Sequence, residues 1–166
     1  IIKQLEYSIK RIKEFKVAYL KFERTHRNKQ AYSTLWGQII EFAKKYNLTD
    51  KGFKYVSISL DSLDITEIDK CRFLIGITVP YSMEVPKGFG TLNIQAGLYS
   101  VFNIKGGYHE LNKIYRNVYL DWLPNSKYRL REQMTFEIYA NTPNKTSTDE
   151  LVTEIYLPIE AKQKIK

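Results

Sequence analysis

Residues 99–122 have the sequence YSVFNIKGGYHELNKIYRNVYLDW and carry three local signals in succession. The apolar and β-branched residues from Tyr99 to Ile104 predict a strand. The glycine pair at 106–107 then predicts a turn. After the turn, apolar residues recur at helical spacing, which predicts an amphipathic helix with one buried stripe. The stripe consists of Tyr108, Leu111, Tyr115, Val118 and Trp122.

The same pattern occurs once more, nearer the N-terminus. An earlier helical stripe, at a constant offset of 76 residues, consists of Tyr32, Leu35, Ile39, Phe42 and Tyr46. The strands before the two stripes, 17–22 and 99–104, match best at an offset of 82, so the first connection is 82 − 76 = 6 residues longer. Loops absorb such differences readily. Sliding the helices by about one turn pairs Trp36 with Tyr115 and fits the helical period almost as well.

Two further strands follow each predicted helix. The apolar segments lie at 55–60 and 73–79 in the first half and at 135–139 and 151–157 in the second. Asn47 suits a left-handed helix end, and Pro124 prevents the second helix from continuing.

The order of these elements predicts an α+β fold built from two strand-helix-strand-strand modules, at about residues 5–80 and 91–160. We expect the modules to pair their antiparallel sheets about a pseudo-twofold axis. The helices then cover one side, and a central cleft is left between the halves.

The composition predicts one domain spanning residues 1–166. The chain is 43% hydrophobic and 14% aromatic, which is enough to bury a core. Its apolar segments are all shorter than the roughly 18 residues that cross a bilayer, so we expect no membrane contact. A single Cys71 and the lack of a secretion-signal core predict a cytoplasmic protein. The first residue is Ile1 and not Met, which favours a fragment excised from a longer protein.

The net charge of +8 raises the question of nucleic-acid binding, because basic surfaces attract phosphates. Residues 1–30 hold nine Lys or Arg and three Glu, which gives 9 − 3 = +6 of that charge. The basic residues alternate with Ile9, Ile12, Phe15 and Val17, a pattern typical of a strand with one solvated face. Direct nucleic-acid binding is therefore the less favoured hypothesis.

Several short motifs in the second half stand in an order that resembles a known family. They are GLYSVF at 97–102, GGY at 106–108, LDWLPNS at 120–126, FEIY at 136–139 and EIYLPI at 154–159. The first half adds the tripeptide at 17–19 and Trp36. Several motifs in the right order are far more specific than one motif alone. Over roughly residues 5–160 the chain resembles the gyrase-inhibitor-like (GyrI-like) effector-binding domains.

This resemblance implies a ligand-sensing domain of the kind often fused behind the helix-turn-helix segments of AraC-type transcription regulators. DNA is then a partner only through a fused segment outside this chain, and a homodimer is compatible with the pattern. Many members of the family have an Asp two residues after the position of Arg72, where this chain has Leu74. We therefore expect its range of ligands to differ from theirs.

Glu137 is the candidate polar contact for a ligand. Strand alternation places Thr135, Glu137 and Tyr139 on one face and Phe136 and Ile138 on the other. A carboxylate that is desolvated among aromatic rings favours a cationic or hydrogen-bond-donating ligand. The residues alone also permit an ordinary solvent-exposed strand Glu. The resemblance implies the first alternative, because relatives place a ligand-contacting Glu here.

Aromatic residues are numerous enough to line a cleft. The candidates are Tyr19, Trp36, Tyr99, Tyr108, Tyr115, Tyr139 and Trp122. For any one of them, packing in the core is the common alternative. The resemblance and the strand faces together favour Trp36, Tyr139 and Tyr19 as ligand contacts, with Tyr108 added to the site. Trp122 is expected to pack.

The sequence predicts no catalytic residue, metal site or cofactor. His26 and His109 are far in sequence from each other and from Cys71, so their spacing assembles neither a metal set nor an activated nucleophile. Some relatives are thought to hydrolyse electrophilic compounds, which keeps a hydrolase that uses Glu137 as an alternative. A protein-interaction domain resembling the gyrase inhibitors is the third.

Overall fold

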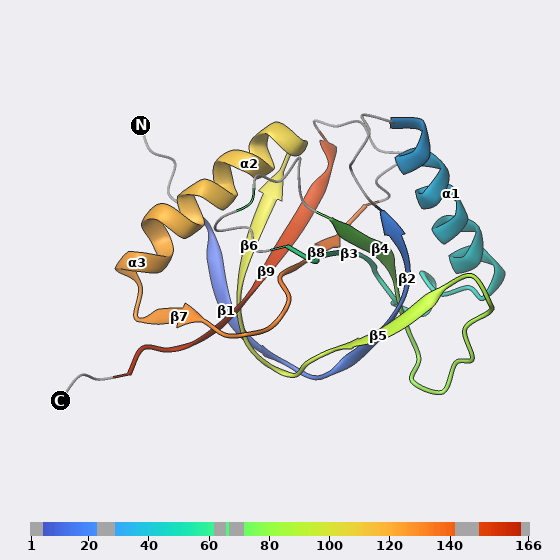
Figure 1. Ribbon diagram of the computed structural model, residues 1–166, viewed down its shortest axis with the longest axis horizontal. Coiled ribbons are helices and arrows are strands. Elements are labelled where there is room, and N and C mark those ends of the chain that lie inside the picture. The colour runs from blue at the N-terminus through green and yellow to red at the C-terminus, as the bar shows by residue number, and fades with distance from the viewer. Residues whose placement is uncertain (1–4, 23–28, 62–65, 67–71, 142–149, 164–166) are drawn as a thin grey trace.

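The computed structural model describes residues 5–22, 29–61, 66, 72–141 and 150–163. Within these ranges nine strands form one sheet, and two longer helical segments lie at its opposite ends (Figure 1). The elements are β1 (Tyr7–Ile12), β2 (Phe15–Phe22), α1 (Lys29–Lys45), β3 (Tyr55–Ser59), β4 (Phe73–Val79), β5 (Gly90–Ile94), β6 (Gly97–Lys105), α2 (Tyr108–Asn117), η2 (Val118–Trp122), α3 (Leu123–Asn125), β7 (Tyr128–Leu130), β8 (Phe136–Tyr139) and β9 (Val152–Ala161). No helix among the described residues is long and apolar enough to span a membrane.

The strand order confirms the predicted α+β fold with an antiparallel sheet. The order is β1-β6-β9-β8-β3-β4-β2-β5, and β7 pairs with β9 outside this path. All the strand pairs within the described residues are antiparallel. The two halves meet where β8 pairs with β3, and also where β1 pairs with β6 and β2 with β5. Each half contains the predicted order of strand, helix, strand and strand, with β1, β5 and β7 in addition. The pseudo-twofold axis itself stays a prediction, because strand order does not fix the rotation that relates the halves.

The helices end as their sequences indicate. After α1, Asn47 adopts a left-handed conformation with φ of 53°, and the Leu48 N–H donates to the Ala43 carbonyl at 2.9 Å. The second helical segment runs through the π-helical turn η2, in which the Leu123 N–H bonds the Val118 carbonyl. Pro124 lies in the first turn of the short α3, and the segment ends one residue later, at Asn125.

Both helices cover the same face of the sheet. Antiparallel partners point to the same side, so Tyr55, Tyr139 and Thr153 share one face across β3, β8 and β9. On this face the residues of α1 pack with Ala18, Tyr55, Ile75, Ile77 and Tyr139, a group that we call the α1 cluster. Residues of α2 pack with Phe73, Phe102, Ile104, Ile155 and Leu157, which we call the α2 cluster.

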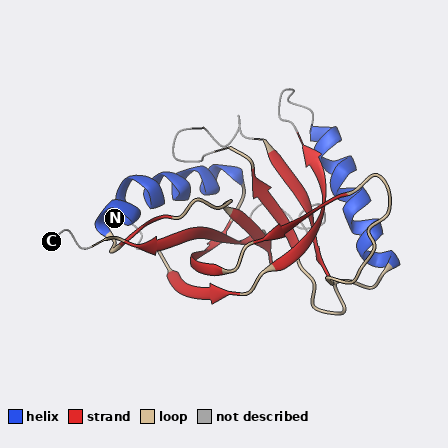
Figure 2. Ribbon diagram, turned by 60° about the horizontal axis from the view of Figure 1, so that its bottom comes forward, coloured by secondary structure: helices blue, strands red, loops and turns tan. Residues whose placement is uncertain are grey.

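The opposite face is also buried, because the sheet curls over itself. Phe136, in the middle of the sheet, contacts Phe15 near one end with ring centroids 5.5 Å apart, and Tyr99 of β6 at 5.4 Å. The curl follows from two corners. β1 leads into β2 across residues 13–14, and β5 leads into β6 across residues 95–96, while β1 pairs with β6 and β2 with β5 (Figure 2).

The structure corrects the expected strand at the N-terminus. Alternation from Ile9 to Val17 predicted a single strand, whereas the chain turns a corner at residues 13–14 and forms two strands in different parts of the sheet. The sequence analysis predicted no strand at β5 or β7. The other six strands match their predictions to within four residues at either end.

The curled sheet leaves no room for a side chain at Gly76. A Cβ at Gly76 would collide with the carbonyl group of Ala18 on the neighbouring strand, and backbone atoms cannot move aside cheaply. We expect Gly76→Ala to lower the free energy of unfolding by about 3 kcal/mol or more.

Gly37→Ala is the matched control, because its Cβ meets nothing within 4 Å in α1. It should stabilise the protein by about 0.5–1 kcal/mol. Urea unfolding measures both, and equal effects would contradict the assignment.

Candidate functional site

Glu137 lies near the centre of the sheet, on the face that carries the helices. It pairs with Ser57 of β3 on one side and Ile155 of β9 on the other. Its side chain is only 3% exposed. The Tyr115 hydroxyl donates to Oε1 at 2.7 Å, and the Tyr139 hydroxyl donates to Oε2 at 3.0 Å. Charge-assisted bonds of this kind compensate the desolvation of a carboxylate.

Trp36 of α1 forms an aromatic wall beside Tyr139. Its ring meets Tyr139 edge to face, with centroids 5.5 Å apart and an interplanar angle of 88°, and it meets Tyr55 similarly at 6.0 Å and 83°. Trp36 is fully buried, yet its indole Nε1 has no hydrogen-bond partner in the structure. Buried Trp N–H groups usually find an acceptor. A ligand with a hydrogen-bond acceptor next to this wall could therefore bond the Trp36 Nε1–H.

Ser57, Glu137 and Thr153 lie between the two apolar clusters on this face, whereas Ser59 and Ser100 border the α2 cluster alone. We call this set of five residues the polar row. All five are buried. The register places all of them on the helix-bearing side, since each pairs directly with, or lies two residues from, a member of the α1 or α2 cluster. A polar row between two apolar patches is typical of a ligand site, where apolar walls bind and a few polar groups orient.

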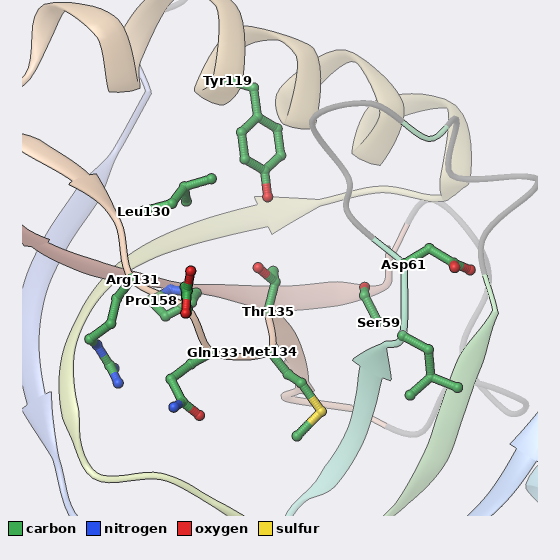
Figure 3. Close-up of a pocket in the computed structure, with 11 residues that line it drawn as sticks. Ser59, Asp61, Tyr119, Leu130, Arg131, Gln133, Met134, Thr135 and Pro158 are labelled. Atoms are coloured by element: carbon green, nitrogen blue, oxygen red, sulfur yellow. The ribbon is translucent and has the colours of Figure 1, made fainter.

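A pocket opens on the same face beside this row. Its cavity volume is about 540 Å³, within the usual range for small-molecule sites. Figure 3 shows Tyr119 of η2 directing its hydroxyl toward Thr135 and Ser59 on the sheet side. Leu130 and Pro158 close one end, and Asp61 lies at the other. Glu137 does not line the pocket, although Thr135 is only two residues before it in the chain.

The structure brings together three of the five predicted site residues. Glu137, Tyr139 and Trp36 are in contact or share a contact partner. Tyr19 is not with them. It pairs with Gly76 of β4 and packs in the cluster on the opposite face, and its role as a ligand contact stays a prediction. The side chain of Tyr108 lies outside the described residues.

Sequence analysis assigned no ligand role to Tyr115. It was one of the aromatic candidates, but its position on the helical stripe indicated core packing, and it does pack in the α2 cluster. The sequence carries no sign that its hydroxyl reaches Glu137, 22 positions away. Trp122 packs as expected. It meets Phe102 and Tyr7 edge to face, each at 5.1 Å between centroids.

Asp61 at one end of the pocket is paired with Arg72. Arg72 donates to Asp61 from its guanidinium at 2.9 Å and from its main-chain N–H at 2.6 Å, and these bonds lower the pKa of Asp61. On the opposite face, burial raises the pKa of Tyr156 to about 12, with Glu154 adding to the shift. The described residues hold no cluster of three or more His, Cys, Asp or Glu that could bind a metal. Cys71 and His26 lie outside the described residues.

The arrangement can bind but offers little machinery for bond cleavage. The carboxylate can accept from a donor or neutralise a cation, and the tyrosine and tryptophan rings can attract a cation through their faces. A curled antiparallel sheet with a buried central carboxylate, aromatic walls and a neighbouring pocket defines a small-molecule-binding domain. The chain belongs to the GyrI-like small-molecule-binding domain family, whose pattern matches residues 5–160.

Solved structures confirm the fold. The EcmrR C-terminal domain is similar with a TM-score of 0.71 and 19% identity, over 96% of this chain and 100% of that one. SAV2435 bound to tetraphenylphosphonium has a TM-score of 0.62 and 15% identity, over 94% of each chain. A protein from Listeria innocua described as a hydrolase has a TM-score of 0.68 and 8% identity, over 95% of this chain and 93% of that one. Comparison with curated protein sequences gave no significant match.

The hydrogen bond from Tyr115 to Glu137 should contribute measurably to stability. Tyr115→Phe keeps the ring in the α2 cluster and removes one donor to the charged carboxylate, so the free energy of unfolding should fall by about 1.5–3 kcal/mol. In the Glu137→Gln background the same change should cost less, because the acceptor is then neutral. Urea unfolding of the four proteins in this cycle gives the coupling.

Tyr81→Phe is the control for this cycle, since Tyr81 is 58% exposed and a surface change of this kind alters stability by less than about 0.5 kcal/mol. A loss for Tyr115→Phe that is the same in both backgrounds would show that the hydroxyl acts elsewhere.

Proposed function

We propose that this domain is the ligand-sensing part of an AraC-type bacterial transcription regulator and that it binds a lipophilic aromatic cation against Glu137. The observation that carries the proposal is the buried carboxylate, which is 3% exposed and held by two tyrosine hydroxyls beside the Trp36 wall. Burying a charged carboxylate costs desolvation free energy. A cationic ligand offsets that cost more than a neutral ligand does.

The ligand class follows from what surrounds Glu137. The wall is made of aromatic rings whose faces attract cations and whose edges pack against flat apolar groups. The bound tetraphenylphosphonium of SAV2435, a cation with four phenyl rings, supports this class for a protein of the same fold. We take tetraphenylphosphonium as the first probe for this reason.

Ligand binding at Glu137 requires movement. Both carboxylate oxygens accept from tyrosines, and 97% of the side chain is covered, so a ligand reaches the carboxylate only when Tyr115 or Tyr139 gives way. Since Tyr115 belongs to α2, its displacement would be transmitted to the helical segment. A ligand that binds the displaced state better than the closed one shifts the balance between them, which is what a sensor needs.

The link to DNA rests on a fused segment. EcmrR is also known as a DNA complex, and this chain covers 95% of its own length but 58% of that longer chain, at a TM-score of 0.63 and 18% identity. This supports a regulator in which a separate part of the polypeptide contacts DNA, and such a regulator works in the cytoplasm.

Glu137→Gln should separate cationic from neutral ligands. The substitution removes the charge and roughly keeps the shape, so affinity for tetraphenylphosphonium should fall by about 1.5–3 kcal/mol, or roughly 10- to 150-fold. Affinity for neutral triphenylphosphine oxide should change much less. Isothermal titration calorimetry of both ligands with both proteins measures the difference.

Glu41→Gln is the matched control, because Glu41 is exposed on α1 and the chemical change is the same. Equal losses for the two ligands, or a loss with Glu41→Gln, would return Glu137 to a structural role. Thermal unfolding of each variant shows that a loss of affinity is not a loss of fold.

A hydrolase is the second candidate function, because the similar Listeria innocua protein is described as one and because Glu137 could accept a proton from water. Turnover of an electrophilic small molecule that Glu137→Gln abolishes would favour an enzyme over a sensor.

We also expect residues 1–166 alone to bind DNA weakly and without sequence preference. The net charge of +8 attracts phosphates, but the described helices lie on the sheet and form no helix-turn-helix pair. Fluorescence anisotropy with two unrelated duplexes should give equal, weak affinities that vanish as salt rises from about 50 to 200 mM. Tight, salt-resistant preference for one duplex would overturn this expectation.

A further inference from the structure

The pocket beside the polar row has a lining that differs from the surroundings of Glu137. Hydroxyl groups face the cavity from two sides, with Tyr119 above and Ser59 and Thr135 on the sheet (Figure 3). Leu130 and Pro158 supply an apolar end. The lining therefore combines neutral donors and acceptors with an apolar surface.

Three segments of the chain connect the pocket lining to the surroundings of Glu137. Thr135 stands just before β8 and precedes Glu137 by two residues, a separation of about 6.5–7 Å in extended chain. On β3, Ser59 lies two residues beyond Ser57, the partner of Glu137. On the helical segment, the rings of Tyr119 and Tyr115 stack with centroids 6.3 Å apart and an interplanar angle of 13°.

The charge around the pocket favours a neutral occupant. Asp61, the acidic group at one end, is held in an ion pair with Arg72 at 2.9 Å. The guanidinium of Arg131 points away from the cavity in Figure 3 and lies over the ring of Tyr99 on the opposite face, 4.9 Å from its centroid. Glu132 also lines the cavity, but it is exposed, so water screens its charge. The buried or half-buried hydroxyls therefore supply the directional hydrogen bonds of the pocket, and these suit neutral oxygen atoms.

The geometry points to a ligand in two parts: a cationic head that binds at Glu137 and a neutral, oxygen-bearing arm that lies in the Tyr119–Thr135–Ser59 pocket. We propose this pocket as the subsite that selects among cations by their arms. The inference rests on the proposed function, because the head must bind at Glu137 for the arm to reach the pocket. The hydroxyls of the pocket would donate to, or accept from, a hydroxyl, ether or carbonyl oxygen on the arm.

Two matched cations test the subsite. Butyltriphenylphosphonium and (4-hydroxybutyl)triphenylphosphonium share head and chain and differ by one terminal hydroxyl. A butyl chain is comparable in length to the separation of Glu137 and Thr135. We expect the hydroxylated cation to bind the parent protein roughly 2- to 10-fold more tightly, the effect of one neutral hydrogen bond. Isothermal titration calorimetry measures both affinities.

Three variants locate the effect. Ser59→Ala, Thr135→Val and Tyr119→Phe each remove one pocket hydroxyl with little change in shape, and at least one of them should bring the two affinities to within a factor of two. Ser100→Ala is the control, since Ser100 is a buried serine on the same sheet face that does not line the pocket. It should leave the preference for the hydroxylated cation intact, and thermal unfolding checks that each variant folds.

The results of these titrations test the subsite separately from the proposed function. If both cations bind the parent equally, the subsite is wrong while cation binding stands. A preference that survives all three pocket variants would place the arm elsewhere and also overturn the subsite. If neither cation binds, the proposed function fails and the subsite fails with it.

Discussion

The bond between Tyr115 and Glu137 is the constraint on which the arrangement of this domain depends. A carboxylate that is nearly inaccessible to water must be hydrogen-bonded, and one of its two donors comes from its own strand while the other comes from α2. The bond therefore fixes the second helical segment over the middle of the sheet. It also keeps polar side chains of the row between the α1 and α2 clusters, so the two apolar clusters do not merge into one featureless core.

The curl of the sheet supplies the second requirement, a rigid support for this face. Both faces of the central strands are buried, one by the helices and one by the aromatic contacts of Phe136 with Phe15 and Tyr99. A strand packed on both sides has little freedom to shift, so Glu137 is held in place from beneath. The helical side is less constrained, since η2 interrupts the regular hydrogen bonding of the segment just after Tyr115. Movement is then easier above the sheet than within it.

Sequence patterns predicted the parts of this structure that depend on local periodicity. The stripes of the two helices, six of the strands and the face of Glu137 all follow from spacings of two or of three to four residues. Sliding the repeat by one helical turn matched Trp36 with Tyr115. Trp36 of α1 contacts Tyr139, and Tyr115 of α2 contacts Glu137.

The features that the sequence patterns did not predict depend on contacts between distant segments. The corner at residues 13–14 depends on which strands become neighbours, and alternation alone contains no information about neighbours. The Tyr115 bond and the hydroxyl-lined pocket join segments far apart in sequence, which periodicity does not connect.

The basic N-terminal segment has a consequence for association between molecules. Among the described strands β1 lies at an edge of the sheet and pairs only with β6, and an unpaired edge can template the addition of another strand. Lys10 and Arg11 are exposed on this strand, and Lys13 is exposed at the corner that follows. A second molecule adding antiparallel to this edge would bring its own cations against them. Repulsion between these cations opposes the addition of a second molecule at β1. Any self-association of the domain should therefore use surfaces other than this edge.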